Sequence, residues 1–354
     1  MKPSTPAVRR LRHLAWVCGL LAAGLGAACA ADDDLPVGAP SGSPAESNYA
    51  AEHGFAFALL GDAPEQATDE PVLSKILAEL GNEVDLAIHT GNIKGRRERC
   101  DDEVYSRRRK LLNNSPVPLI YTPGEYDWAE CDRDGSPYSP VERLSRLREL
   151  FFDNTHSLCM LTLELQRQSE TARFRGYPEN ARWEYGGILF VTLNVPGNHN
   201  NFRTAAGRNG EYEERVQADA YWLRQAFANA EHEKLRGLVV AMRADPHLTG
   251  RRDTGANGGD AYAGLKAELL RLAPKYQGEV LIAHGAYTEA ISQHLPDHPL
   301  RAGGKPLENV TRIRTYDAPH SPYWIKVSVA PGRKNVFRID TAVIPPALKK
   351  PGQR

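Results

Sequence analysis

Short apolar runs alternate with amphipathic stretches through most of the chain, from about residue 54 onward. The runs at 55–60 and 280–283 are continuous and bounded by glycine or polar residues, which is typical of buried strands. Between such runs, apolar residues recur at helical spacing, as in 70–80. This alternation predicts an α/β architecture. Strands are expected at 55–60, 84–89, 117–121, 188–194, 237–242, 279–284, 323–329 and 335–339, and helices at 70–80, 102–112, 141–151, 214–230 and 261–272.

The pattern also suggests how the chain is divided. Residues 31–53 are rich in Pro, Gly, Ser and acidic side chains and have little to bury, so we expect a flexible linker there. No internal repeat and no second linker interrupts residues 54–345, which we expect to form one domain. Residues 346–354 are expected to form a C-terminal tail.

The first thirty residues have the pattern of a signal peptide. Arginines at 9, 10 and 12 precede an apolar run at 14–25, and small residues follow, with cleavage expected before Ala31. The apolar run is short for a bilayer span, so we expect a periplasmic or secreted protein with no transmembrane span after processing. The alternatives are a retained membrane anchor and a lipoprotein anchored through Cys29, since Leu25-Gly26-Ala27-Ala28-Cys29 resembles a lipobox.

Charge and cysteine content narrow the possible partners. Lys plus Arg, at 44, equals Asp plus Glu, at 44, so the whole chain has no net field that would attract nucleic acid. Processing would leave Cys100, Cys131 and Cys159. An oxidising compartment favours one disulfide and one unpaired thiol. We expect Cys100 to pair with Cys131, because both lie in polar sequence whereas Cys159 lies in an apolar stretch; three reduced cysteines are the alternative.

Polar residues follow several of the expected strands directly. Asp62 follows the first strand, Asn92 the second, and Glu125 and Asp127 the third, while His284 ends a later one. The carboxyl ends of neighbouring strands in an α/β sheet meet at one edge, where such proteins place their sites. These side chains are therefore candidates for a common site.

The residues at these strand ends resemble those of calcineurin-like metallophosphoesterases, in particular an exported bacterial branch of that family. The resemblance covers nearly the whole mature chain and implies a four-layer α/β/β/α sandwich of two mixed sheets. The matching segments, in family order, are Leu60-Gly61-Asp62, His89-Thr90-Gly91-Asn92, Thr122-Pro123-Gly124-Glu125-Tyr126-Asp127, Met242-Arg243-Ala244-Asp245-Pro246 and Ala283-His284-Gly285-Ala286-Tyr287-Thr288.

The family's chemistry needs two divalent metals that share a carboxylate and supply hydroxide. Two doubly charged ions about 4 Å apart repel by roughly 16 kcal/mol at an effective dielectric near 20, so anionic ligands must offset that cost. Here Asn92 stands at the position of the bridging aspartate. Residues that are not the family's ligands also stand at other motif positions, namely Pro64, Tyr126, Arg243, Asp245, Ala286 and Thr288.

Of the implied ligand set, only Asp62 is kept, and Glu125 is a chemically possible substitute. We therefore expect no metal cofactor at full occupancy. The alternative is one divalent ion, such as calcium or magnesium, held by Asp62, Asn92 and Glu125.

The expected function follows from these substitutions. We expect an exported protein with a degenerate metal site that acts as a binding or scaffold protein, with a small anionic or phosphorylated ligand or a protein as its partner. The alternative is a phosphomono- or diesterase with an atypical, mononuclear site, so enzyme activity stays an open question. Asp127, His199, Arg243 and His284 are candidate ligand-binding residues, and each has a structural alternative as a loop or core residue.

Overall fold

The computed structural model describes residues 44–159, 161–203, 209–246, 248, 259–285, 300–302, 305–315 and 324–343. The expected signal peptide, Cys29 and the C-terminal tail lie outside these residues. Among the described residues, no helix is both long and apolar enough to cross a bilayer.

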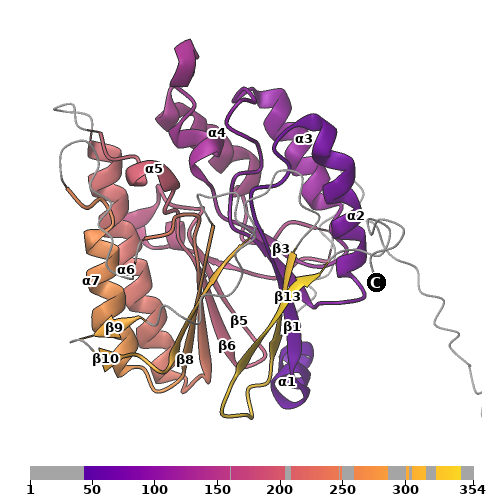
Figure 1. Cartoon of the computed structure of the whole chain (residues 1–354), viewed down its shortest axis with the longest axis vertical. Coiled ribbons are helices and arrows are strands. Elements are labelled where there is room, and N and C mark those ends of the chain that lie inside the picture. Colours follow the sequence, from indigo (N-terminus) through magenta and orange to yellow (C-terminus); the bar gives the residue numbers. More distant parts are fainter. Residues whose placement is uncertain are drawn as a thin grey trace, which may run out of the picture.

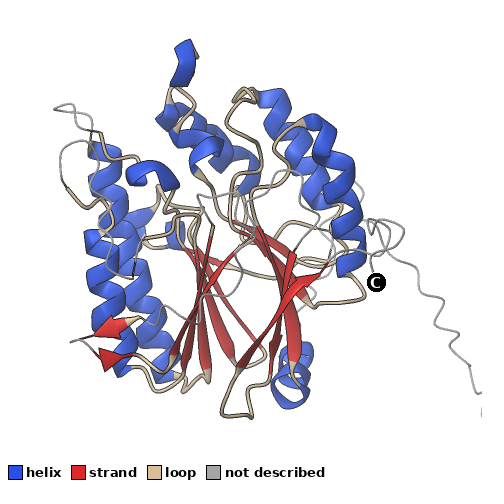
Figure 2. Cartoon of the chain, viewed as in Figure 1, coloured by secondary structure: helices blue, strands red, loops and turns tan. Residues whose placement is uncertain are grey.

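Two mixed sheets pack face to face, and helices cover their outer sides (Figures 1 and 2). The first sheet has the order β13 (Phe337–Val343), β12 (Trp324–Val329), β1 (Phe55–Leu60), β2 (Leu86–His89) and β3 (Leu119–Tyr121). The second has the order β11 (Val310–Arg314), β8 (Glu279–His284), β7 (Gly237–Ala241), β6 (Ile188–Thr192), β5 (Ala181–Tyr185) and β4 (Gln166–Arg167). A small ribbon pairs β9 (Arg301–Ala302) with β10 (Lys305–Pro306).

The helices are distributed over both sheets. Figure 1 shows α2 and α3 outside the first sheet, and α6 and α7 outside the second. The α-helices are α1 (Pro44–His53), α2 (Glu70–Leu80), α3 (Asp102–Asn113), α4 (Pro140–Phe151), the short α5 (Gly197–Asn200), α6 (Gly210–His232) and α7 (Ala263–Leu272). A single π-helical turn, η2 (Glu125–Ala129), follows β3.

Three apolar layers hold this sandwich together, and β1 shows how the sequence builds them. Successive side chains of a strand point to opposite faces. Phe57 and Leu59 therefore pack into the core between the sheets, while Ala58 and Leu60 pack against α2. A third layer joins the second sheet to α6 and α7. The expected α/β fold with two mixed sheets in a four-layer sandwich is confirmed.

The structure differs from the sequence-based expectation in the linker and in several short elements. The last ten residues of the expected linker form α1, whose Ala50 is buried in the core between the sheets and whose Ser47 Oγ accepts a hydrogen bond from the Gly186 amide. The strands β4, β5 and β11 were not expected, because they are short or carry arginine and glutamate between their apolar residues. β5 and β11 pair with the apolar strands β6 and β8, which compensates for their weak local signal, and β4 pairs with β5.

Candidate functional site

Four polar side chains from both sheets meet at the carboxyl ends of the strands. Asp62 follows β1, Asn92 follows β2, Glu125 begins η2 after β3, and Arg243 follows β7 in the other sheet. All four are buried. The convergence expected for Asp62, Asn92 and Glu125 is thus present, and Arg243 joins them.

Asn92 faces the two carboxylates with its amino group. Its Nδ2 donates to Asp62 Oδ1 at 2.8 Å and to Glu125 Oε1 at 2.9 Å. Its Oδ1 accepts a hydrogen bond from the Tyr126 amide at 3.0 Å. The backbone therefore fixes which end of the amide points inward. The atom that Asn92 presents to the carboxylates is a donor, whereas a metal ligand must offer a lone pair.

Arg243 supplies the positive charge at this point. Its Nη2 donates to Asp62 Oδ1 at 2.7 Å and to Glu125 Oε1 at 3.1 Å. Gly285, just after β8, leaves space for the guanidinium, because a Cβ there would lie 1.6 Å from Arg243 Nη1. The side chain expected to bind a ligand instead forms an internal ion pair that joins the two sheets.

Two glycines bring the loops after β2 and β3 into contact. Gly91 has a φ of +98°, and a Cβ on it would lie 2.7 Å from the Gly124 nitrogen. A Cβ on Gly124 would lie 2.5 Å from the Asn92 nitrogen. Both glycines are needed because no side chain fits between the two backbones. This close approach places Asn92 beside Glu125.

Asp127, a candidate ligand-binding residue, has structural contacts here. Its Oδ2 accepts hydrogen bonds from the amides of Asn92, at 2.8 Å, and Gly124, at 2.7 Å, and from the Tyr121 hydroxyl, at 2.8 Å. Burial raises the pKa of Asp127 to about 6, although these donors favour the charged form. The carboxylate thus holds the loops after β2 and β3 in place.

Neither candidate histidine, His199 or His284, is one of the four side chains that meet at this point. His284 ends β8 on the face of Ile282, which packs toward the helices, and its Nδ1 lies 2.7 Å from the Gly285 carbonyl. Burial lowers the pKa of His284 to about 4, so the ring is neutral at pH 7. The loop that holds His199 does reach the cluster, but through the Gly197 amide, which donates to Glu125 Oε2 at 3.0 Å.

Two buried residues next to the cluster were not among the sequence candidates. His89 ends β2, its Nε2 lies 2.8 Å from the Ala63 carbonyl, and burial lowers its pKa to about 4. Lys94 is buried, donates to the Gly95 carbonyl, and has its pKa lowered by that burial. The position of His89 at a strand end could have marked it as a candidate site residue. Lys94 lies in a polar loop whose burial the sequence does not reveal.

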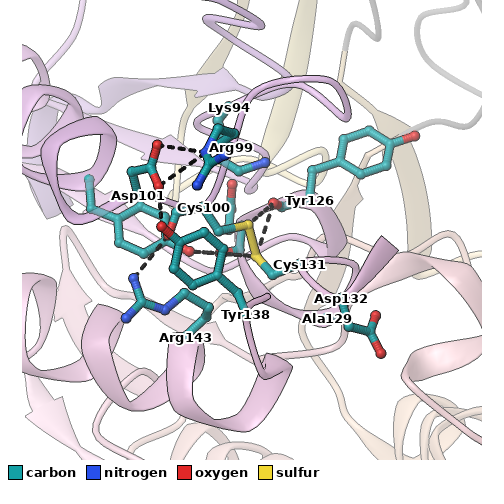
Figure 3. The surroundings of a disulfide bond; sticks show 12 residues. Lys94, Arg99, Cys100, Asp101, Tyr126, Ala129, Cys131, Asp132, Tyr138 and Arg143 are labelled. Carbon is teal, nitrogen blue, oxygen red and sulfur yellow. Dashed lines mark hydrogen bonds and ion pairs between the residues drawn. A yellow bond between two sulfur atoms is a disulfide. The ribbon is translucent and has the colours of Figure 1, made fainter. Parts of the chain in front are cut away.

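The expected disulfide between Cys100 and Cys131 is present, with a Cα–Cα distance of 5.9 Å (Figure 3). It lies beside η2, the turn that carries Glu125: Cys131 Sγ is 3.6 Å from the Asp127 carbonyl oxygen, and Cys100 Sγ is 3.8 Å from that of Tyr126. Cys159 is disulfide-bonded in the whole chain. The expectation that it stays an unpaired thiol concerns the chain after removal of the first thirty residues, and it stays a prediction.

We expect the double replacement of Cys100 and Cys131 by serine to lower the free energy of unfolding by about 3.5 kcal/mol. The bond spans 31 residues, and closing a loop of that length restricts the unfolded chain by this amount. Urea unfolding of the variant, compared with oxidised wild type, measures the loss. Unchanged stability in the variant would show that the bond does not constrain the unfolded chain.

The donor set at the strand ends does not fit the metal centre that the resemblance implies. Among the described residues, no group of three or more His, Cys, Asp or Glu side chains could hold a metal ion. The oxygens of Asp62 and Glu125 that face each other already accept hydrogen bonds from Asn92 and Arg243. A divalent ion needs several oxygen ligands around it, and here two nitrogen donors lie between the available oxygens.

Comparison with known proteins gives a similarity of fold only. No family model and no curated protein matches the chain. Similar solved structures include purple acid phosphatase PPD1 from yellow lupin, with 14% identity and a TM-score of 0.47; the match covers 78% of this chain and half of that protein. GAP50, the anchor in the inner membrane complex of Plasmodium, has 12% identity, a TM-score of 0.42 and coverage of 82% and 89%. A 5'-nucleotidase precursor from Thermus thermophilus has 10% identity, a TM-score of 0.43 and coverage of 82% and 54%.

Proposed function

We propose that this chain is an exported protein of metallophosphoesterase fold that lacks dinuclear metal chemistry and acts as a binding or scaffold protein. The observation that carries the proposal is the orientation of Asn92, whose Nδ2 donates to both Asp62 and Glu125. A bridging ligand must share negative charge between two cations. A neutral amide that offers N–H groups cannot do so.

Electrostatics supports the same conclusion. Two metal ions at this point would have to displace the Arg243 guanidinium and overcome their mutual repulsion of roughly 16 kcal/mol at about 4 Å. Asp62 and Glu125 are the carboxylates that face this position, and both already pair with Arg243. Two carboxylates cannot offset that repulsion, so the strand ends suit a metal-free protein.

The ion pairs of two arginines on α3 help to decide which class of partner the protein binds. Arg107 pairs with Glu70 and Glu98, and the buried Arg108 pairs with the same two carboxylates. These guanidinium groups are engaged within the protein, which leaves less charge for a small phosphorylated ligand. This favours a protein over a small anion as the ligand that the loops at the strand ends bind.

Export is supported by two independent features. The first thirty residues have the signal-peptide pattern, and the buried disulfide between Cys100 and Cys131 suits an oxidising compartment such as the periplasm or the exterior.

The test is elemental analysis of mature protein purified without chelators, together with release of nitrophenol from phosphomonoester and phosphodiester substrates. We expect substoichiometric manganese, iron, zinc and calcium, and turnover no faster than that of the Asp62→Asn control. One tightly bound metal per chain, with turnover that Asp62→Asn abolishes, would support the mononuclear phosphoesterase instead. Two bound metals with the same dependence on Asp62 would refute the proposal outright.

A further inference from the structure

One nitrogen atom of Arg243 occupies the point between two carboxylates that a cation would take. Nη2 lies 2.7 Å from Asp62 Oδ1 and 3.1 Å from Glu125 Oε1. The same two oxygens also accept from Asn92 Nδ2, at 2.8 and 2.9 Å. The two oxygens and two nitrogens thus form a closed ring of contacts. The carboxylates converge on a common position rather than on separate partners.

Burial makes a cation necessary at this position. The side chains of Arg243, Asp62 and Glu125 are 2%, 6% and 0% exposed. Ionised carboxylates held close together in such surroundings repel each other and lack hydration. A guanidinium remains charged at all physiological pH values, so Arg243 is a permanent counter-charge.

The surroundings of Arg243 are shaped for the guanidinium. Gly285 packs against it so closely that a Cβ would lie 1.6 Å from Nη1 and 2.7 Å from Cζ. Arg243 comes from the second sheet, whereas Asp62 and Glu125 come from the first. The guanidinium therefore links the loops of the two sheets, which is what a metal ion bound to ligands from both sheets would do.

We propose that Arg243 is a tethered cation that replaces a metal ion, and that its removal uncovers a site for one divalent cation between Asp62 and Glu125. The inference rests on the proposed function in one respect, since both take the native strand ends to be free of metal. Without the guanidinium, the two buried carboxylates would keep Asn92 Nδ2 as a shared donor but would lack a positive counter-charge. Carboxylate and water oxygens are the ligands that Mg²⁺, Mn²⁺ and Ca²⁺ prefer.

The test compares wild type with Arg243→Ala and Arg243→Lys by calorimetric titration with MnCl₂, MgCl₂ and CaCl₂. We expect Arg243→Ala to bind one Mn²⁺ per chain, whereas wild type and the lysine variant, which keeps the charge, bind none. At a concentration about 100 times the dissociation constant, Mn²⁺ should raise the melting temperature of Arg243→Ala by about 5 °C. EDTA should leave the melting temperature of wild type unchanged.

Two further variants keep the test decisive if Arg243→Ala folds poorly. The double variant Asp62→Asn with Arg243→Ala should lose Mn²⁺ binding. The triple variant that adds Glu125→Gln should recover a cooperative melting transition without metal, because no unpaired carboxylate remains. If the triple variant has no higher melting temperature and no more cooperative transition than Arg243→Ala, the proposal is overturned and Arg243 is a packing residue.

The remaining outcomes separate this inference from the proposed function. A folded Arg243→Ala that binds no Mn²⁺, beside a metal-free wild type, refutes the inference and leaves the proposed function intact. Wild type that binds one Mn²⁺ as tightly as the alanine variant refutes the inference, and wild type that binds two with turnover that depends on Asp62 refutes both.

Discussion

Replacing Gly91 by alanine is expected to lower the free energy of unfolding by about 4 kcal/mol, a loss large enough to be diagnostic. The new Cβ would lie 2.7 Å from the Gly124 nitrogen and 2.9 Å from its Cα, and backbone atoms cannot move aside as a flexible side chain can. The φ of +98° adds strain for any residue with a Cβ. Urea unfolding of the variant measures the loss.

Gly135→Ala is the matched control for this prediction. Gly135 also has a positive φ, of +77°, but nothing lies within 4 Å of the position of its Cβ. The Gly135→Ala variant should therefore lose only the free energy that the left-handed backbone conformation costs a residue with a Cβ, about 1 kcal/mol. If the two variants lose the same stability, the close approach of the backbones at Gly91 does not matter and the account of the site must change.

Replacing Arg215 by alanine should cost about 3–5 kcal/mol, the range measured when one partner of a buried ion pair is removed. Arg215 is buried on α6 and donates to the carbonyl oxygens of Asn194, at 3.0 Å, and Asn200, at 2.9 Å. It also pairs with Glu211 on its own helix, and it lies 5.5 Å from the centre of the Trp128 ring in η2. Its removal would leave the Glu211 carboxylate, whose side chain is 15% exposed, and two loop carbonyls without this donor.

Arg224→Ala provides the comparison on the same helix. Arg224 pairs with Glu268 at 2.8 Å, but its side chain is 39% exposed, so its replacement should cost less than about 1 kcal/mol. Thermal and urea unfolding of both variants give the difference. Equal losses would mean that Arg215 contributes no more than a surface ion pair.

The long apolar strands of the fold could be predicted from the sequence, whereas the polar and short ones could not. β1 is apolar throughout and β8 is apolar between its end residues, as expected for strands covered on both faces, so the local pattern is sufficient. In β5 and β11 charged residues lie between the apolar ones, and only their place beside β6 and β8 makes them strands. For α1 one buried alanine was too weak a signal.

The site was predicted in its position and only in part in its chemistry. Asp62, Asn92 and Glu125 follow neighbouring parallel strands, so the geometry of one sheet brings them together. Arg243 belongs to the other sheet, and its pairing depends on how the two sheets face each other, which no local pattern encodes. Asp127 was expected to face a ligand, whereas its partners are backbone amides of the loops after β2 and β3 and the Tyr121 hydroxyl. The sequence pattern does not distinguish a carboxylate that binds backbone amides from one that faces a ligand.

The position of α1 determines how the protein can be attached to a surface without blocking its loops. α1 ends one residue before β1 begins, at the opposite end of the strand from Asp62. The six residues of β1 separate the two ends by roughly 20 Å. A tag or immobilising group joined ahead of Pro44 would therefore leave the loops that carry Asp62, Asn92 and Glu125 turned away from the support. Capture experiments that search for a binding partner should use that orientation.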